Sequence, residues 1–146
     1  MTPWAWVGIG MGVFALVAWG RRPGASRGAV APTAGIARVA EGIAVAEGYP
    51  VPGSIAQRQH NPGNLKLPAD GGRISTFATA ADGWAALYRQ LDLVRLGRSA
   101  YYSVQTTIEQ MGRVWTATVS EQGAWSRTVA AYVGVPVTTP LGAVLG

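Results

Sequence analysis

Residues 47–65 read Glu-Gly-Tyr-Pro-Val-Pro-Gly-Ser-Ile-Ala-Gln-Arg-Gln-His-Asn-Pro-Gly-Asn-Leu, and this stretch decides how the chain is organised. Glu47 ends a segment whose apolar residues recur at helical spacing. The prolines that follow prevent this helix from continuing, because proline lacks a backbone N–H and clashes with the preceding turn. Residues 61–64, Asn-Pro-Gly-Asn, are a second turn signal. The stretch therefore predicts a rigid loop with one carboxylate at its mouth.

Around this loop, the chain beyond the first 32 residues is predicted to be mostly helical, with four helices. They lie at about Thr33–Glu47, at Thr79–Gly97, from Thr106 or Thr107 with Ile108, Met111 and Trp115 facing inward, and around Trp125, Val129 and Tyr132 up to Gly134. Two of the starts carry capping-box patterns, with Asp82 and Gln110 placed to return a bond to the cap.

A single strand signal lies between the first two helices. Residues 65–67 and 73–77 flank the string Pro-Ala-Asp-Gly-Gly at 68–72, which favours a turn. We therefore expect a small β-hairpin inserted among packed helices, so that the fold class is mostly α with a minor β component (α+β).

The composition limits the kinds of partner and of binding site that this chain can have. The chain has 146 residues, a net charge of +5, one histidine and no cysteine. The positive charge suits a polyanionic partner, such as a membrane surface, a cell wall or nucleic acid. No segment interleaves basic and aromatic residues, so we expect no nucleic-acid partner. Disulfides and thiolate sites are excluded, and we expect no metal and no cofactor.

Residues 1–20 carry no charged side chain and are long enough to cross a bilayer as a helix. Tryptophans lie near both ends of this run, as in an interfacial aromatic belt. A cleaved secretion signal is the alternative, but such signals begin with basic residues and this one does not. We expect an uncleaved anchor at 1–20, a flexible basic linker at 21–34 and a folded domain at 35–146. Arg21 and Arg22 would hold that domain on the cytoplasmic or virion-interior side.

Helical phase separates two candidate carboxylates in the first predicted helix. With Ile36 as the origin and 100° per residue, Glu47 falls at about 20°, on the apolar stripe. Glu41 falls near 140°, beside Arg38 on the polar face, where we expect a solvated charge with a weak pairing. A carboxyl against apolar surface has a raised pKa, which is the condition for a general acid at neutral pH. Helix phase leaves a second interpretation open, in which Glu47 only caps the helix with its carboxylate in water.

The order of these motifs resembles the lysozyme-like domains of the lytic transglycosylase type found in phage virion proteins and bacterial enzymes. Members show a helix ending in Glu-Gly, then Pro-Gly-Ser, an arginine and Asn-Pro-Gly-Asn-Leu. The matching residues lie within 36–141 and are Glu47-Gly48, Pro52-Gly53-Ser54, Arg58, Asn61-Pro62-Gly63-Asn64-Leu65, Phe77, Asp82-Gly83-Trp84-Ala85-Ala86-Leu87, Thr107-Ile108, Trp125, Val129 and Gly134-Val135. The chain departs from the pattern at Gln59 and His60, at 112–117 and at Gln122.

The resemblance implies cleavage of the β-1,4 bond between N-acetylmuramic acid and N-acetylglucosamine in peptidoglycan. Glu47 would protonate the glycosidic oxygen and then act as the base, while the substrate's own 6-hydroxyl closes on C1. The residues expected to hold the acetamido and hydroxyl groups of the sugar are Asn61, Asn64, Ser75, Thr76 and Tyr132, and Phe77 is expected to stack on the sugar. A hydrolytic muramidase would need a second carboxylate. Asp70 and Asp82 are the candidates for it.

The expected partners are peptidoglycan glycan strands, the membrane through residues 1–20, and other membrane proteins of a virion. The expected location is the internal membrane of a phage particle or the apparatus that opens the wall during infection. Two alternatives stay open at this point. One is a host-lysing muramidase, and the other is a non-catalytic wall-binding membrane protein of the virion.

Overall fold

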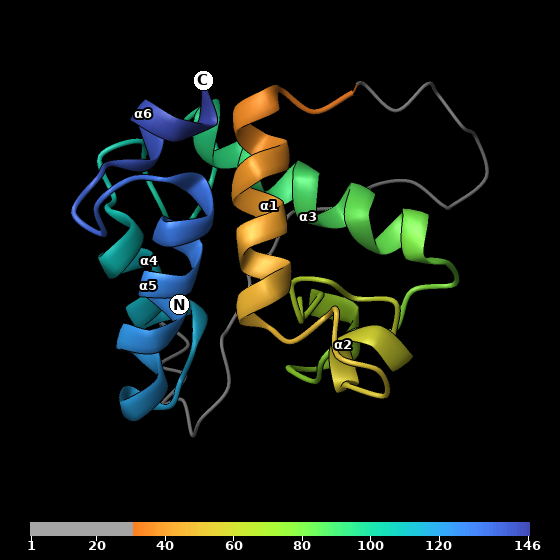
Figure 1. Ribbon diagram of the computed structural model, residues 1–146. Helices are drawn as coiled ribbons and strands as arrows, with labels where there is room; N and C mark the ends of the chain where they lie inside the picture. The colour runs from red at the N-terminus through yellow and green to blue at the C-terminus, as the bar shows by residue number, and fades with distance from the viewer. Residues whose placement is uncertain (1–30) are drawn as a thin grey trace, which may run out of the picture.

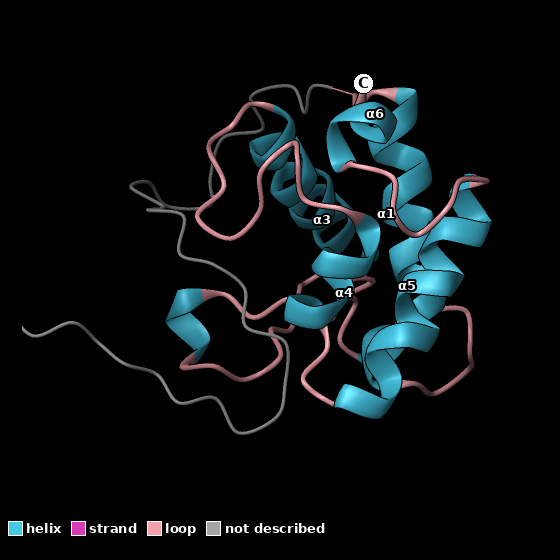
Figure 2. Ribbon diagram, turned by 90° about the vertical axis from the view of Figure 1, so that its left-hand side faces the viewer, coloured by secondary structure: helices cyan, strands magenta, loops and turns pink. Residues whose placement is uncertain are grey.

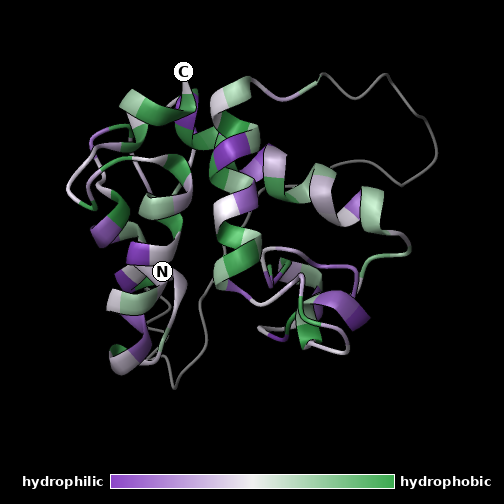
Figure 3. Cartoon of the chain, viewed as in Figure 1, coloured by the Kyte–Doolittle hydropathy of each residue, from purple (hydrophilic) through white to green (hydrophobic). Residues whose placement is uncertain are grey.

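The computed structural model describes residues 31–146, which fold around a central helix, α1 (Ala34–Ala46). Helix α5 (Val119–Val133) packs along one side of α1, and α3 (Ala80–Arg95) packs against it from another direction (Figure 1). The predicted mostly helical fold is confirmed. Helix α1 carries both polar and apolar residues along its length (Figure 3), as expected for a helix with one buried and one exposed face.

Shorter elements complete the domain. Helix α4 (Ile108–Trp115) packs on α5, and α6 (Leu141–Leu145) contacts both α1 and α3. The connection from α1 to α3 contains α2 (Ile55–Arg58) and the 3-10 helix η1 (Pro68–Asp70). In this connection the chain turns repeatedly, and Figure 2 shows it as loop apart from these short elements. Helices α2, η1 and α6 were not predicted, because elements of three to five residues carry little periodicity.

Threonine side chains cap three of the helices in residues 31–146, two of them where capping patterns were predicted. The side chain of Thr33 accepts a hydrogen bond from the backbone of Ile36 at 3.0 Å and begins α1. Thr79 caps α3, and Thr107 with Gln110 forms a complete capping box at α4. These bonds satisfy backbone N–H groups that have no partner within the helix, and they fix where each helix begins.

The predicted β-hairpin at residues 65–77 is wrong, since no strand occurs within residues 31–146. The two segments do lie together, because the backbone N–H of Ser75 donates to the oxygen of Leu65 at 2.8 Å. The next bond comes from a side chain: the N–H of Leu67 donates to Oγ of Ser75 at 2.7 Å. The side-chain NH₂ group of Asn61 donates to the backbone oxygens of both Leu65 and Ser75, each at 2.8 Å. Buried side chains therefore replace the backbone ladder.

The predicted membrane anchor at residues 1–20 lies outside the described residues, as does most of the linker. Within residues 31–146, no helix is both long enough and apolar enough to cross a membrane.

Gly83, in the first turn of α3, lets the loop before Asn61 rest directly on that helix. A Cβ added at Gly83 would lie 1.8 Å from the backbone oxygen of His60. Because this neighbour is backbone, one of the two segments would have to move. The glycine therefore sets the distance between α3 and the loop that carries Asn61 and Asn64.

We predict that Gly83→Ala lowers the free energy of unfolding by about 1–3 kcal/mol, the usual cost of overpacking. Gly123→Ala is the matched control, since its Cβ would meet only the flexible end of Arg127, at 3.1 Å. In helix α5 this second change should stabilise by about 0.5–1 kcal/mol, because alanine is the better helix former. Thermal unfolding of both variants measures the difference. Equal stability of the two would show that the loop does not rest on α3 as described.

Candidate active site

Glu47 lies at the C-terminal end of α1, where the chain leaves the helix. Its backbone N–H still bonds to the oxygen of Ile43 at 2.9 Å, and Gly48 follows with a positive φ of 75°. The side chain emerges from the buried side of α1 and is half-buried, whereas Glu41 is exposed. The difference between the two glutamates follows the phase argument from sequence.

Both oxygens of the Glu47 carboxylate are held by neutral N–H donors. The side-chain amide of Asn64 donates to Oε2 at 2.6 Å, and the indole N–H of Trp125 donates to Oε1 at 2.8 Å. Asn64 comes from the loop after α2 and Trp125 from α5. The carboxylate is therefore fixed between two segments that are far apart in sequence. It is not turned to water as a simple helix cap would be.

Three stacked aromatic rings form a wall beside this carboxylate. Trp125 stacks on Trp115 with ring centres 5.4 Å apart, and Trp115 stacks on Tyr102 at 6.3 Å. All three rings are buried. The indole N–H of Trp115 reaches the backbone oxygen of Gly63 at 3.3 Å, which ties the wall to the Asn61–Asn64 turn. The wall fixes the direction in which Trp125 presents its N–H group.

Burial raises the pKa of Glu47, and this is the dominant influence on it. The hydrogen bonds from Asn64 and Trp125 favour the charged form and oppose the rise, as does the nearby indole N–H of Trp115, while the negative charge of Glu121 adds to the rise. The net pKa is above the ordinary glutamate value. The side chain thus keeps its proton to higher pH than an exposed glutamate, as a general acid requires.

Asn61 and Ser75 hold the loop together. Asn61 is fully buried, and its oxygen accepts the N–H of Leu65 at 2.8 Å while its amide makes the two bonds described above. Ser75 is 1% exposed and bonds to Leu67. A sugar cannot reach either side chain while the loop keeps this conformation, so their role in the structure is to shape the turn that presents Asn64.

The other predicted sugar contacts are spread over the surface. Thr76 is exposed, and Phe77 packs partly against the core. Tyr132 is exposed on α5, and its hydroxyl donates to Glu41 at 2.9 Å. The ion pairs of residues 31–146 are Arg95–Asp92 and Arg113–Glu109. The predicted pairing of Glu41 with Arg38 is therefore not formed, and the tyrosine hydroxyl takes its place.

The two carboxylates considered as a second acid or base lie at the ends of helical elements. Asp70 ends η1, and the Asp82 carboxylate accepts the hydroxyl of Thr79 at 2.8 Å as part of a helix cap. The carboxylate whose charge acts on Glu47 is Glu121, in the first turn of α5. It precedes Trp125 by four residues, so both lie on one face of that helix. No signal in the sequence marked Glu121 as functional.

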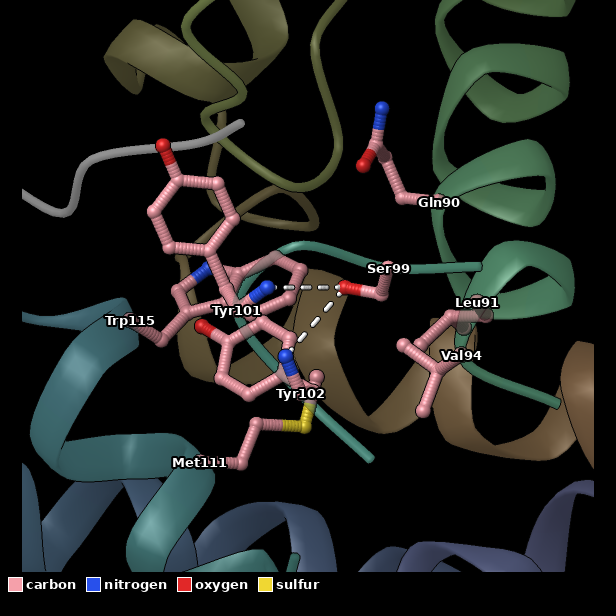
Figure 4. Close-up of a pocket in the computed structure, with 8 residues that line it drawn as sticks. All are labelled: Gln90, Leu91, Val94, Ser99, Tyr101, Tyr102, Met111 and Trp115. Atoms are coloured by element: carbon pink, nitrogen blue, oxygen red, sulfur yellow. Dashed lines mark hydrogen bonds between the residues drawn. The ribbon is translucent and has the colours of Figure 1, made fainter. Parts of the chain in front are cut away.

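A cavity of about 10 Å³ lies behind the aromatic wall, where Trp115 forms part of its lining. Figure 4 shows its other residues, with Ser99 accepting the backbone N–H groups of Tyr101 and Tyr102. This volume suits about one water molecule and no sugar ring. Within residues 31–146, no cluster of three or more His, Cys, Asp or Glu side chains could hold a metal ion.

No family model, curated protein or solved structure matches this chain. The features of the chain that bear on function are therefore the surroundings of Glu47 and the order of the motifs around it.

Proposed function

We propose that this protein is a peptidoglycan lytic transglycosylase in which Glu47 is the single acid and base. The observation that carries the proposal is the half-buried Glu47 carboxyl, held by the neutral donors Asn64 and Trp125. A carboxyl with a raised pKa and a fixed direction is what protonation of a glycosidic oxygen needs. The motif order around the same residue supports this reading.

In the proposed reaction, protonated Glu47 gives its proton to the oxygen between the two sugars as the bond from C1 to that oxygen breaks. Positive charge then develops at C1 and the ring oxygen. The Glu47 carboxylate next takes the proton of the 6-hydroxyl on the same muramic acid residue. That oxygen closes on C1, which gives the 1,6-anhydro product and restores the acid. Thr76 and Tyr132 stay predicted sugar contacts.

Hydrolysis is the second candidate, and Glu121 is the observation that favours it. Its negative charge is the smallest of the influences on the pKa of Glu47 and comes from the first turn of α5. Inverting and retaining glycosidases use two carboxylates, with the second one acting on water or on the sugar. In this alternative Glu121 takes the place that the sequence assigned to Asp70 or Asp82.

The products distinguish the two reactions. We expect full-length protein in detergent to release muropeptides from purified walls that carry 1,6-anhydro ends, lighter by one water than hydrolysis products. Glu121→Gln should leave the rate within about threefold, because in the transglycosylase Glu121 transfers no proton. Removal of a catalytic acid or base would instead lower the rate by about 10²–10⁴-fold. Mass spectrometry of the digest measures both. Reducing-end products that disappear in Glu121→Gln would establish the hydrolase, and wall binding without release would establish a non-catalytic protein.

We also propose that the enzyme belongs to a phage particle and opens the wall during infection. The support is the uncharged run at residues 1–20 followed by Arg21 and Arg22, which favours an inward-facing domain in the producing cell. Protease added to spheroplasts tests the orientation. An inward-facing domain is protected until the membrane is permeabilised, and immediate digestion would indicate an exported, host-lysing enzyme.

A further inference from the structure

The contact between Asn64 and Glu47 is short for an N–H to oxygen hydrogen bond. Nitrogen of Asn64 lies 2.6 Å from Oε2 of Glu47. N–H to oxygen bonds usually span 2.7–3.2 Å, whereas O–H to oxygen bonds span 2.5–3.0 Å. The oxygen and nitrogen of an asparagine amide have nearly the same shape and exchange places on rotation by half a turn. With the amide oxygen facing Glu47, the same separation would suit a carboxylic acid O–H.

The other end of the same amide has no partner. Oδ1 of Asn64 is buried and accepts no hydrogen bond from any residue that the structure describes. After rotation, the amide nitrogen would occupy that same unmatched position. Each orientation thus leaves one polar group unpaired there. The choice between the two orientations is therefore decided mainly by what Glu47 presents, a carboxylate oxygen or an O–H group.

Trp125 cannot respond in this way, because an indole N–H only donates. It bonds to Oε1 and so favours the unprotonated state of that oxygen. Trp115 is a second donor-only indole that acts on the carboxylate, and Glu121 on α5 is the charged group that acts on it. These neighbours leave Oε2, the oxygen facing Asn64, as the place for the proton.

We propose that Asn64 is a positioning residue that rotates with the proton state of Glu47. Its amide N–H donates to the carboxylate, and its oxygen accepts the O–H of the acid on Oε2. The side chain of Glu47 is then held in one direction both when it gives the proton and when it takes one back. The catalytic role of this rotation rests on the proposed function. The rotation itself is testable without any glycan, so the proposed function and the rotation can fail independently.

Neutron diffraction from deuterated crystals of the full-length protein tests the rotation directly. Data are collected below and above the midpoint of the Glu47 titration. We expect the ND₂ group of Asn64 to face Glu47 at the higher pH and the oxygen to face it at the lower pH. The same group facing Glu47 at both values would overturn the proposal.

A titration of two variants provides the second test, read by NMR from ¹³C-labelled glutamate. Trp125→Phe removes a donor that serves only the carboxylate, so the Glu47 midpoint should rise by about one pH unit. Asn64→Gly removes a partner that serves both the carboxylate and the acid form of Glu47. The Glu47 midpoint should therefore rise less than half as far as in Trp125→Phe. Glycine is chosen because Asn64 has a positive φ of 47°. A rise in Asn64→Gly as large as that in Trp125→Phe would show that Asn64 serves the carboxylate alone.

Discussion

Glu47→Gln should reduce the release of muropeptides from purified walls by about 10²–10⁴-fold, the usual worth of general acid and base catalysis. Glutamine nearly matches the acid in shape but cannot donate a proton of suitable acidity. Its side-chain oxygen can still accept the indole N–H of Trp125, and its N–H group can donate to the oxygen of Asn64 once the Asn64 amide has rotated. We therefore expect the fold and wall binding to be kept. Turnover of walls by the full-length variant measures the loss.

Glu41→Gln is the matched control, since it changes the same residue type on the same helix. Glu41 is exposed, and its carboxylate accepts the hydroxyl of Tyr132. Its variant should keep its activity within about twofold, because a solvated charge contributes little. If Glu47→Gln retained more than about a tenth of the activity, Glu47 would not be the catalytic acid.

The raised pKa of Glu47 also sets the sign of two pH effects. Activity that needs the protonated acid falls as pH rises through this pKa. The folded protein binds the Glu47 proton more tightly than the unfolded chain, so its contribution to stability is full at low pH and declines between the unfolded and folded pKa values. Unfolding measured across this range should show that slope in the wild type and lose it in Glu47→Gln.

Trp115→Ala should lower the free energy of unfolding by about 3–5 kcal/mol, a large part of the stability of a typical domain. Trp115 is 3% exposed, stacks on both Trp125 and Tyr102, and bonds to Gly63. Its removal would enlarge the neighbouring cavity and release the indole of Trp125. Near-UV circular dichroism during thermal unfolding of the full-length protein measures the change.

Val114→Ala on the same helix is the comparison for Trp115→Ala, because Val114 is 41% exposed. Exposed positions of this kind usually change stability by less than about 0.5 kcal/mol. If Trp115→Ala cost no more than Val114→Ala, the stacked rings would not support the site.

Local signals determined the main helices from the sequence. Thr79 and Thr107 begin helices where the capping patterns placed them, because a cap acts on backbone groups two or three residues away. The phase of α1 separated half-buried Glu47 from exposed Glu41, since burial on a helix follows its 3.6-residue period. These features depend on neighbours in the chain and can be read without a fold.

The hairpin prediction failed for a reason that local pattern cannot reveal. Residues 65–77 have the turn and the extended flanks of a hairpin, but the buried side chains of Asn61 and Ser75 take the bonds that a ladder would use. In the sequence, residues 61–64 look like an isolated four-residue turn. In the structure, Asn61 makes the hydrogen bonds that hold a larger loop together. Side-chain competition for backbone groups decides such cases.

The sequence by itself determined which carboxylate emerges from the buried face and which helices surround it. Only the tertiary structure decided what meets that carboxylate: Asn64 from the loop, Trp125 and Glu121 from α5, and Trp115 behind them. These contacts join segments separated by up to 78 residues in the chain, and they exist only when α1 packs against α5. Helical period and capping carry no information about such pairings, because packing of the whole core fixes them.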